Sequence, residues 1–145
     1  MRIFYINRDV DSNRREMMKD ALQETGIEAE RVPGVDGYDA PDWLAAFYDR
    51  KMPPGESGCS ASHLLVSSKI IAENLPWAVV LEDDARPKAG FLQAVEDAVA
   101  NAPADWDVIR LTRRSKWSVL TVCALPDHRR LIQYSKIPPG TWAHR

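Results

Sequence analysis

Three consecutive acidic residues, Glu82, Asp83 and Asp84, follow directly on the apolar run Trp77–Leu81. The run is rich in β-branched and apolar residues and has a proline on either side of it, which predicts a short buried strand. The acidic triplet is therefore expected at the end of a strand. In open α/β sheets the carboxyl ends of the strands are the places where ligands bind.

Neighbouring carboxylates repel one another unless a cation or basic side chains compensate them. Oxygen ligands of this kind favour Mg²⁺ or Mn²⁺, held partly by protein and partly by the phosphates of a substrate. The alternative is a solvated acidic turn, which is common after strands. The triplet alone does not decide between these two interpretations.

Length and composition narrow the class of protein. The chain has 145 residues, of which 45% are hydrophobic, enough for one domain with its own core. A formal net charge of −2 and a pI near 5.9 provide no basic field, so nucleic acid is not an expected partner. No apolar run approaches about eighteen residues, so neither a signal peptide nor a transmembrane segment is expected, and a cytoplasmic location is predicted.

The cysteine content indicates no disulfide framework. Cys59 and Cys123 are the two cysteines, and their spacing fits neither a disulfide scaffold nor a zinc ligand set. Both are expected to be reduced and structural, with Cys59 packed as a small apolar side chain.

The first third of the chain predicts strand, helix, strand. Residues 2–7 are apolar and aromatic, as in an inner strand, and residues 28–32 form a second short candidate. Between them, Asn13 and Glu16 have the spacing of a capping box, and Gly26 ends the helical pattern. The expected inward face of this helix consists of Met17, Met18, Ala21 and Leu22. No Gly-rich phosphate loop follows the first strand.

The rest of the chain continues the alternation. A short helix is predicted over residues 41–48, a breaker-rich loop over 51–58 and a longer helix over Ser60–Asn74. The expected inward residues of the longer helix are Leu64, Val66, Ile70 and Ile71. After the acidic triplet, helical spacing recurs over residues 91–99, and strands are predicted over 107–111, 119–125 and 131–134.

Four segments in this order resemble glycosyltransferase family 25, a group of bacterial lipopolysaccharide or lipooligosaccharide galactosyltransferases with relatives that act on collagen. The segments are YINRDVDSNRREMM at 5–18, RVPGVDG at 31–37, GESGCSASH at 55–63 and AVVLEDDARP at 78–87. A fainter match continues through DWDVIRL at 105–111 and Gly140–Thr141. Any one of these segments alone would be weak evidence for the family, but four of them in the same order make a coincidental match improbable.

The resemblance implies an α/β fold of the GT-A-like type, in which helices flank a mainly parallel central sheet. It implies a single domain over residues 1–145, with donor and metal binding in 1–87 and a partial remainder in 88–145. It also implies a UDP-sugar donor and a divalent cation, Mn²⁺ or Mg²⁺, on the diphosphate. By analogy Asp84 is the expected metal ligand, with Glu82 as a second ligand and with Glu82 or Asp83 reaching the ribose or a metal-bound water.

Other donor-binding residues follow from the matched segments: Asn7, Arg8, Arg14, Arg15, Gly58, Ser62 and His63. Asn7 and Arg8 match the nucleotide-facing turn after the first strand, and Arg14 or Arg15 would pair with diphosphate oxygens. For both of these arginines the alternative is a solvated helix surface. For His63 the alternative is a buried residue at a helix start that hydrogen-bonds to backbone.

The function implied is metal-dependent transfer of a hexose, galactose, from a UDP-sugar to a saccharide acceptor in lipopolysaccharide or related glycan biosynthesis. The chain ends earlier than family members do, so a truncated or decayed homologue that only binds a nucleotide sugar, or serves as a folded partner domain, is the alternative. A metal-dependent phosphoryl-transfer enzyme or hydrolase is a weaker third interpretation. No general base is assigned. The late candidates are Asp105, Asp107, His128 and His144.

Overall fold

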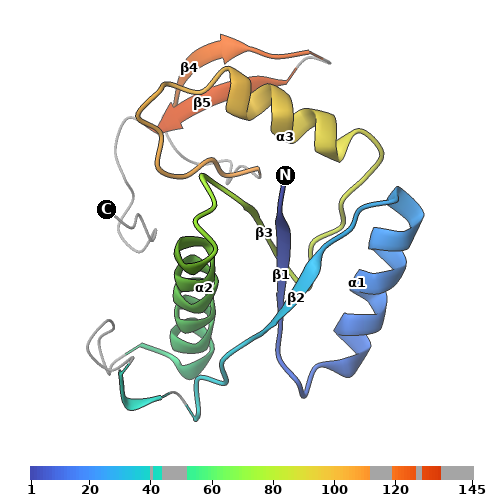
Figure 1. Ribbon diagram of the computed structural model, residues 1–145, viewed down its shortest axis with the longest axis vertical. Coiled ribbons are helices and arrows are strands. Elements are labelled where there is room, and N and C mark those ends of the chain that lie inside the picture. Colours follow the sequence, from blue (N-terminus) through green and yellow to red (C-terminus); the bar gives the residue numbers. More distant parts are fainter. Residues whose placement is uncertain (40, 44–51, 112–118, 127–128, 135–145) are drawn as a thin grey trace. The chain divides into compact units, whose positions relative to one another are not determined.

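The computed structural model describes residues 1–39, 41–43, 52–111, 119–126 and 129–134 (Figure 1). The chain divides into two compact units, Met1–Ala89 and Gly90–Arg145. We refer to them as the N-terminal unit and the C-terminal unit. Among the described residues, no helix is both long and apolar enough to cross a membrane.

The N-terminal unit is built on a three-stranded sheet of β1 (Ile3–Asn7), β2 (Glu30–Pro33) and β3 (Val79–Glu82). The strand order is β2-β1-β3, and β1 pairs with both neighbours in parallel. This confirms the expected α/β organisation with a parallel sheet. Because the strands are parallel, the ends that carry Asn7, Pro33 and Glu82 meet at one edge of the sheet.

Two helices flank this sheet, α1 (Ser12–Thr25) on one side and α2 (Pro54–Ala72) on the other (Figure 1). Both helices begin at the edge where the strands end, so their N-termini lie at the same end of the unit as the acidic triplet (Figure 1). Gly26 ends α1 in the left-handed conformation, at φ +66°. There its N–H bonds to the carbonyl of Gln23, and the N–H of Ile27 bonds to the carbonyl of Leu22, a Schellman motif.

The core between α2 and the sheet is centred on Phe4, Val32 and Val66. Ile6 and Ile70 are among the partly buried side chains that pack against it. Phe4 and Ile6 alternate along β1 and therefore share one face of the sheet, the face that α2 covers. This packing fixes α2 along the sheet and so fixes the position of its first turns.

Helix α2 begins earlier than the sequence pattern indicates. The expected loop over 51–58 is wrong, because the helix starts at Pro54 and not at Ser60. A proline is well tolerated there, since the first helical position needs no N–H partner. Val66 and Ile70 pack inward as predicted, but Ile71 is 77% exposed. Ile71 lies about 140° around the helix from Val66 and so points away from the core.

Helix α1 also differs in detail from the prediction. It begins at Ser12, with Asp11 in the N-cap position and no side-chain capping bond, so the capping box of Asn13 and Glu16 is wrong. The carboxylate of Asp11 pairs with Arg8 instead. Met18 is fully buried, whereas its neighbour Met17 is 52% exposed.

The C-terminal unit contains α3 (Phe91–Ala100) and a hairpin of β4 (Val119–Ala124) and β5 (Arg130–Tyr134). The helix and both strands were predicted, and the strands pair antiparallel with an irregularity between Thr121 and Cys123. The strand expected over 107–111 does not form. Val108 and Leu111 in that segment are exposed, and the described part of the chain provides no strand beside it. The helix expected over 41–48 lies mostly outside the described residues.

Candidate functional site

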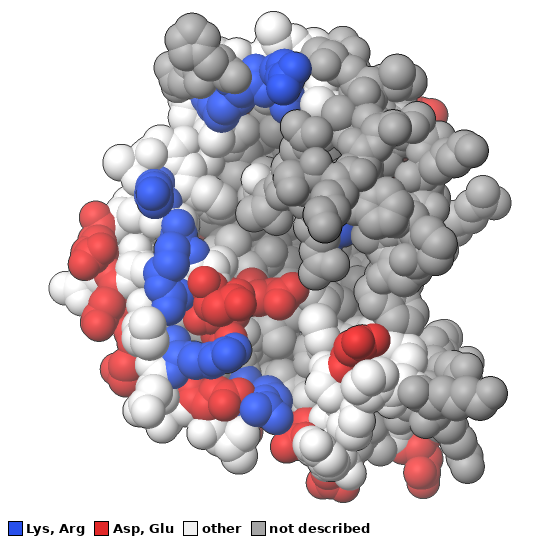
Figure 2. All heavy atoms as spheres, turned by 180° about the vertical axis from the view of Figure 1, so that it is seen from behind, with Lys and Arg blue, Asp and Glu red and all other residues white. Residues whose placement is uncertain are grey.

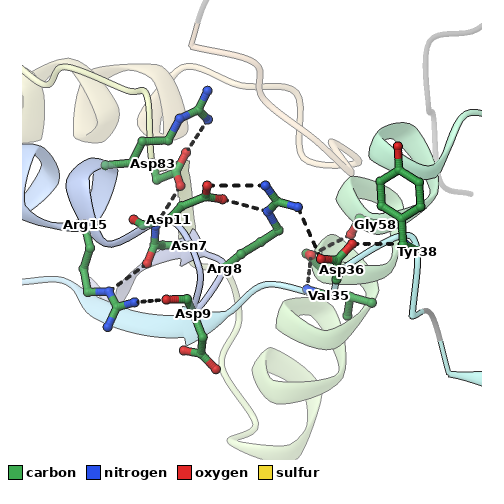
Figure 3. Close-up of polar contacts among 12 residues, drawn as sticks. Asn7, Arg8, Asp9, Asp11, Arg15, Val35, Asp36, Tyr38, Gly58 and Asp83 are labelled. Atoms are coloured by element: carbon green, nitrogen blue, oxygen red, sulfur yellow. Dashed lines mark hydrogen bonds and ion pairs between the residues drawn. The ribbon is translucent and has the colours of Figure 1, made fainter.

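Asn7, the last residue of β1, connects the central strand to the acidic triplet. Its side chain is buried, with 1% of the residue exposed. Its Nδ2 donates a hydrogen bond of 2.8 Å to Oδ2 of Asp83 and one of 3.1 Å to the backbone carbonyl of Asp11 (Figure 3). The sheet register makes this possible, because β1 and β3 pair in parallel up to Ile6 and Glu82. The carboxylate of Asp83 is therefore turned toward the protein.

The second oxygen of Asp83 is held by a basic side chain. Nη1 of Arg14, in the first turn of α1, lies 3.0 Å from Oδ1 of Asp83. The carboxylate of Asp83 is thus compensated within the protein by one cation and one amide. The repulsion expected within the triplet is therefore relieved at Asp83 by an arginine.

Two further arginines hold the amide oxygen of Asn7. Nε of Arg15 donates to it at 3.0 Å and Nε of Arg31 at 3.2 Å. Arg31 also donates a hydrogen bond of 2.9 Å to the backbone carbonyl of Asn7. It donates another to the carboxylate of Asp9, and this second bond lowers the pKa of Asp9. Figure 3 shows Arg15 turned toward Asn7 and Asp9. Sequence reasoning missed Arg31, whose only signal was its place in the RVPGVDG segment.

Arg8 lies between the start of α1 and the loop after β2. Its Nε donates to Oδ2 of Asp11 at 2.7 Å, and its Nη1 lies 3.5 Å from Oδ2 of Asp36 (Figure 3). The hydrogen bond from Arg8 lowers the pKa of Asp11 below its ordinary value of 3.8. The Arg8 side chain remains partly exposed. It is therefore positioned by acids and still reachable from solvent.

The loop after β2 packs closely against the first turns of α2. The backbone N–H of Val35 donates to Oγ of Ser62 at 2.8 Å, and Ser62 donates to the carbonyl of Gly58 at 2.6 Å. A Cβ at Gly58 would lie 2.7 Å from the carbonyl oxygen of Val35, so only glycine fits. Ser62 is buried, and its hydroxyl makes both bonds to backbone.

His63 faces the end of β3 from α2. Its Nε2 lies 3.5 Å from Oε1 of Glu82. Hydrogen bonds with Cys59 and then with Glu82 raise the pKa of His63 from 6.5 to about 9, although partial burial acts in the opposite direction. Cys59 is exposed, so the expectation that it packs in the interior is wrong. It lies one residue beyond Gly58 and therefore on a different face of the helix from the packed loop.

These segments surround a cavity of about 260 Å³. The predicted site residues that line it are Arg8, Arg14, Gly58, Ser62, His63, Glu82 and Asp83. Asn7 and Arg15 are not among the lining residues. They contribute indirectly, because Asn7 bonds to Asp83 and Arg15 bonds to Asn7. Asp84 is exposed and is not one of the lining residues. Asp11, Asp36 and Cys59 line the cavity as well, and the predictions did not include them.

The late candidates for a general base stay predictions. Asp105 and Asp107 belong to the C-terminal unit, and His128 and His144 lie outside the described residues, as do Gly140 and Thr141. The candidate site described above is contained entirely within the N-terminal unit.

Charges of both signs alternate over part of the surface. Figure 2 shows a row of basic side chains directly beside acidic ones, rather than separate fields of one sign. The pairs Arg8–Asp11, Arg14–Asp83 and Arg31–Asp9 have this character. Such a surface can bind a small anion at one arginine without forming a long basic track for a polyanion.

Residues 1–128 match the family described as Glycosyltransferase family 25 (LPS biosynthesis protein). A "Glycosyltransferase 25 family member" of Drosophila melanogaster is 33% identical over 129 residues, 78% of this chain and 21% of the relative. A relative of the same description in Aedes aegypti is 30% identical over 138 residues, 81% of this chain and 23% of the relative. Human "Procollagen galactosyltransferase 2" is 29% identical over 147 residues, 90% of this chain and 24% of the relative.

The chain spans less than a quarter of the length of these curated relatives. The family match, by contrast, covers the whole N-terminal unit and much of the C-terminal one. It includes every segment that surrounds the cavity. The chain is therefore a member of glycosyltransferase family 25.

Proposed function

We propose that this chain binds a UDP-hexose in the cavity of the N-terminal unit and takes part in transfer of the hexose, galactose, to a saccharide acceptor. The acceptor belongs to lipopolysaccharide or a related glycan, and the fold is of the GT-A-like type. Family membership supports the reaction class. The names of the relatives, procollagen galactosyltransferases among them, favour galactose as the hexose.

One contact carries the proposal within the site. The 2.8 Å hydrogen bond from Asn7 to Asp83 joins the end of the central strand to the acidic triplet. The pairing of β3 with β1 places Glu82 and Asp83 at the same cavity as Arg8 and Arg14. Carboxylates and arginines around one cavity match a ligand that carries both a sugar with hydroxyl groups and a diphosphate.

The residues present fit a divalent cation of the magnesium or manganese type. Asp83 is engaged by Asn7 and Arg14, whereas the side chains of Glu82 and Asp84 are exposed on either side of it. Carboxylate oxygens are the ligands that these ions prefer, so Asp84 and Glu82 would hold the ion together with the donor phosphates. When bound, such an ion neutralises the charge that develops on the departing nucleoside diphosphate.

The protein's own groups orient the donor. Arg8 and Arg14 are partly exposed at the cavity and can donate hydrogen bonds to diphosphate oxygens. Helix α2 begins beside the same cavity, where Gly55 and Gly58 are part of the lining. Asp83 is kept in place by the hydrogen bond from Asn7, whose amide oxygen in turn accepts hydrogen bonds from Arg15 and Arg31.

The test of donor binding is calorimetric titration of the chain with UDP, UDP-galactose and UDP-glucose, with and without Mn²⁺. We expect binding that requires the ion, and loss of that binding in Asp84→Asn with an unchanged melting temperature. Asp20→Asn, on the exposed face of α1, is the matched control and should bind like the parent. Equal UDP affinity in Asp84→Asn and the parent would refute the assignment of the metal ligands.

Transfer is tested separately from binding. UDP release and disaccharide formation are measured across acceptors that end in galactose, glucose or N-acetylglucosamine. Formation of a disaccharide from UDP-galactose supports the proposal. Donor binding without any product would instead identify this chain as a nucleotide-sugar-binding homologue that does not catalyse transfer.

A further inference from the structure

Three side chains of different chemistry converge beside the cavity: Cys59 and His63 of α2, and Glu82 of β3. A sulfur of Cys59, a ring nitrogen of His63 and a carboxylate oxygen of Glu82 all lie within 4.8 Å of one another. We propose that these three side chains form a binding site for a thiophilic divalent cation of the zinc type. The proposal concerns metal binding by the chain itself and does not rest on the proposed transferase function.

The distances suit a tetrahedral ion. With metal–nitrogen and metal–oxygen bonds of about 2.0–2.2 Å, two ligand atoms of a tetrahedral zinc site lie about 3.3–3.5 Å apart. Nε2 of His63 and Oε1 of Glu82 are already 3.5 Å apart. A thiolate at a bond length of about 2.3 Å needs about 3.6 Å from the other ligands. The sulfur of Cys59, which lies within 4.8 Å of the other two ligand atoms, therefore has to move by at most about 1.2 Å, on the order of a side-chain adjustment.

The backbone holds the three positions rigidly. Cys59 and His63 are four residues apart on one helix, so their side chains lie one above the other on the same face. Ser62, between them, ties this part of α2 to the backbone of Val35. Glu82 is fixed from the opposite side, because it pairs with Ile6 in the sheet. The site is thus assembled by two anchored elements rather than by a loop.

The charges around the site permit a cation. The two arginines that line the same cavity are both paired with acids, Arg8 with Asp11 and Asp36, and Arg14 with Asp83. Cys59 is exposed, so an ion can enter from solvent. Three protein ligands leave the fourth tetrahedral position for water or for an anion in the cavity. On binding, the thiol proton of Cys59 and the second ring proton of His63 both leave to solvent, so that the sulfur coordinates as thiolate and the imidazole as the neutral ring.

The site differs in chemistry from the acidic triplet. Sulfur and imidazole ligands select zinc over magnesium and manganese, whereas Asp84 offers only oxygen. The two sites share Glu82, so an ion held by Cys59 and His63 competes with one that uses Glu82 and Asp84. The sequence spacing of Cys59 and Cys123 had indicated no zinc ligand set. The set arises instead because the fold places β3 beside α2.

The test uses Co²⁺ as a spectroscopic substitute for zinc, added to the full chain after treatment with a chelator and a phosphine reductant. We expect thiolate-to-cobalt charge-transfer absorption that saturates at one equivalent and is abolished by added Zn²⁺. Cys59→Ser should remove the absorption, and His63→Gln or Glu82→Gln should weaken cobalt binding at least about tenfold. Cys123→Ser, which alters the other cysteine, is the control and should behave like the parent. Asp84→Asn removes a ligand of the competing site and should therefore not weaken cobalt binding.

Several outcomes would overturn the proposal. One is absence of the absorption at saturating Co²⁺. Others are persistence of the absorption in Cys59→Ser or its loss in Cys123→Ser. Equal weakening of cobalt binding by Asp84→Asn and Glu82→Gln would place the ion on the carboxylates. A second measurement needs no variant. Zn²⁺ should slow alkylation of Cys59 at least about tenfold while leaving the alkylation rate of Cys123 unchanged. Equal alkylation of Cys59 with and without Zn²⁺ would refute the site even if a variant failed to fold.

Discussion

At the scale of single residues, Asn7 has a role that few side chains can fill. Its amide donates to Asp83 and to the backbone of Asp11, while its oxygen accepts from Arg15 and Arg31. An aspartate at this position would face Asp83 with a like charge and could donate nothing to it. A buried side chain that both donates and accepts is therefore required where β1 ends.

Asn7→Ala should lower the free energy of unfolding by about 1–3 kcal/mol, because it leaves buried hydrogen-bonding groups without their partner. The measurement is urea denaturation followed by circular dichroism. Asn13→Ala changes the same residue type at an exposed position of α1 and should stay close to the parent. A variant at Asn7 as stable as the parent would show that water replaces the amide without cost.

The pair of Arg8 and Asp11 predicts a dependence of stability on pH. Because the pKa of Asp11 is lowered below 3.8 in the folded protein, its contribution to stability is fully present above pH 3.8 and is lost as the pH falls through the folded pKa. The difference in melting temperature between the parent and Arg8→Gln should therefore be positive at pH 7 and shrink below pH 3.8. A difference that is constant from pH 7 to pH 2 would contradict this pairing. The effect should be small, since the pair is partly exposed.

At the scale of elements, the contact between the loop after β2 and the start of α2 shapes the cavity. It depends on glycine at two facing positions, Gly37 and Gly58, whose backbones approach too closely for a Cβ. Ser62 adds hydrogen bonds to both sides of the contact. The turn-forming residues that look like a linker in sequence thus form a packed interface.

Gly58→Ala should destabilise the protein by about 1–3 kcal/mol, because the new methyl group overlaps the carbonyl of Val35 and the helix has to shift. Gly55→Ala is the control within the same helix, since a Cβ there meets nothing within 4 Å. That control should be neutral or more stable, by up to about 1 kcal/mol, as alanine favours helix. Thermal melts of both variants test the prediction, and equal destabilisation by both would refute the close contact.

At the scale of the whole molecule, the two units differ in how their strands are stabilised. β1 lies between two neighbours and carries Phe4, which is fully buried in the core of the N-terminal unit. In the C-terminal unit, β4 and β5 form a two-stranded sheet. A sheet of two strands is only marginally stable by itself.

Amide hydrogen exchange should therefore separate the units. We expect slow exchange in β1 and β3 and faster exchange in β4 and β5 under native conditions, because a two-stranded sheet is only marginally stable by itself, whereas β1 is paired on both sides. Exchange followed by NMR or mass spectrometry provides the test. Equal protection of Phe4 and Leu131 would show that the units open as one cooperative body.

The sequence by itself determined the kinds of elements and much of their order. Apolar runs and helical spacing predicted β1, α1, β3, α3 and the hairpin strands, because these patterns reflect which face of each element is buried. The position of the acidic triplet at a strand end also followed, since Leu81 closes the apolar run. The four matched segments indicated the family, because they contain residues typical of it, and the family match over residues 1–128 confirms this.

Only the tertiary structure decided the partners of each side chain. Asn7 and Asp83 are 76 residues apart and meet because β3 pairs with β1, which no local pattern specifies. The same strand order brings Glu82 to His63. The burial of Met18 and the exposure of Met17 were also decided by the tertiary structure. Helical periodicity is compatible with an inward position for either residue, but the sheet covers only one side of α1. Local spacing fixes the face of an element, whereas long-range packing fixes what that face meets.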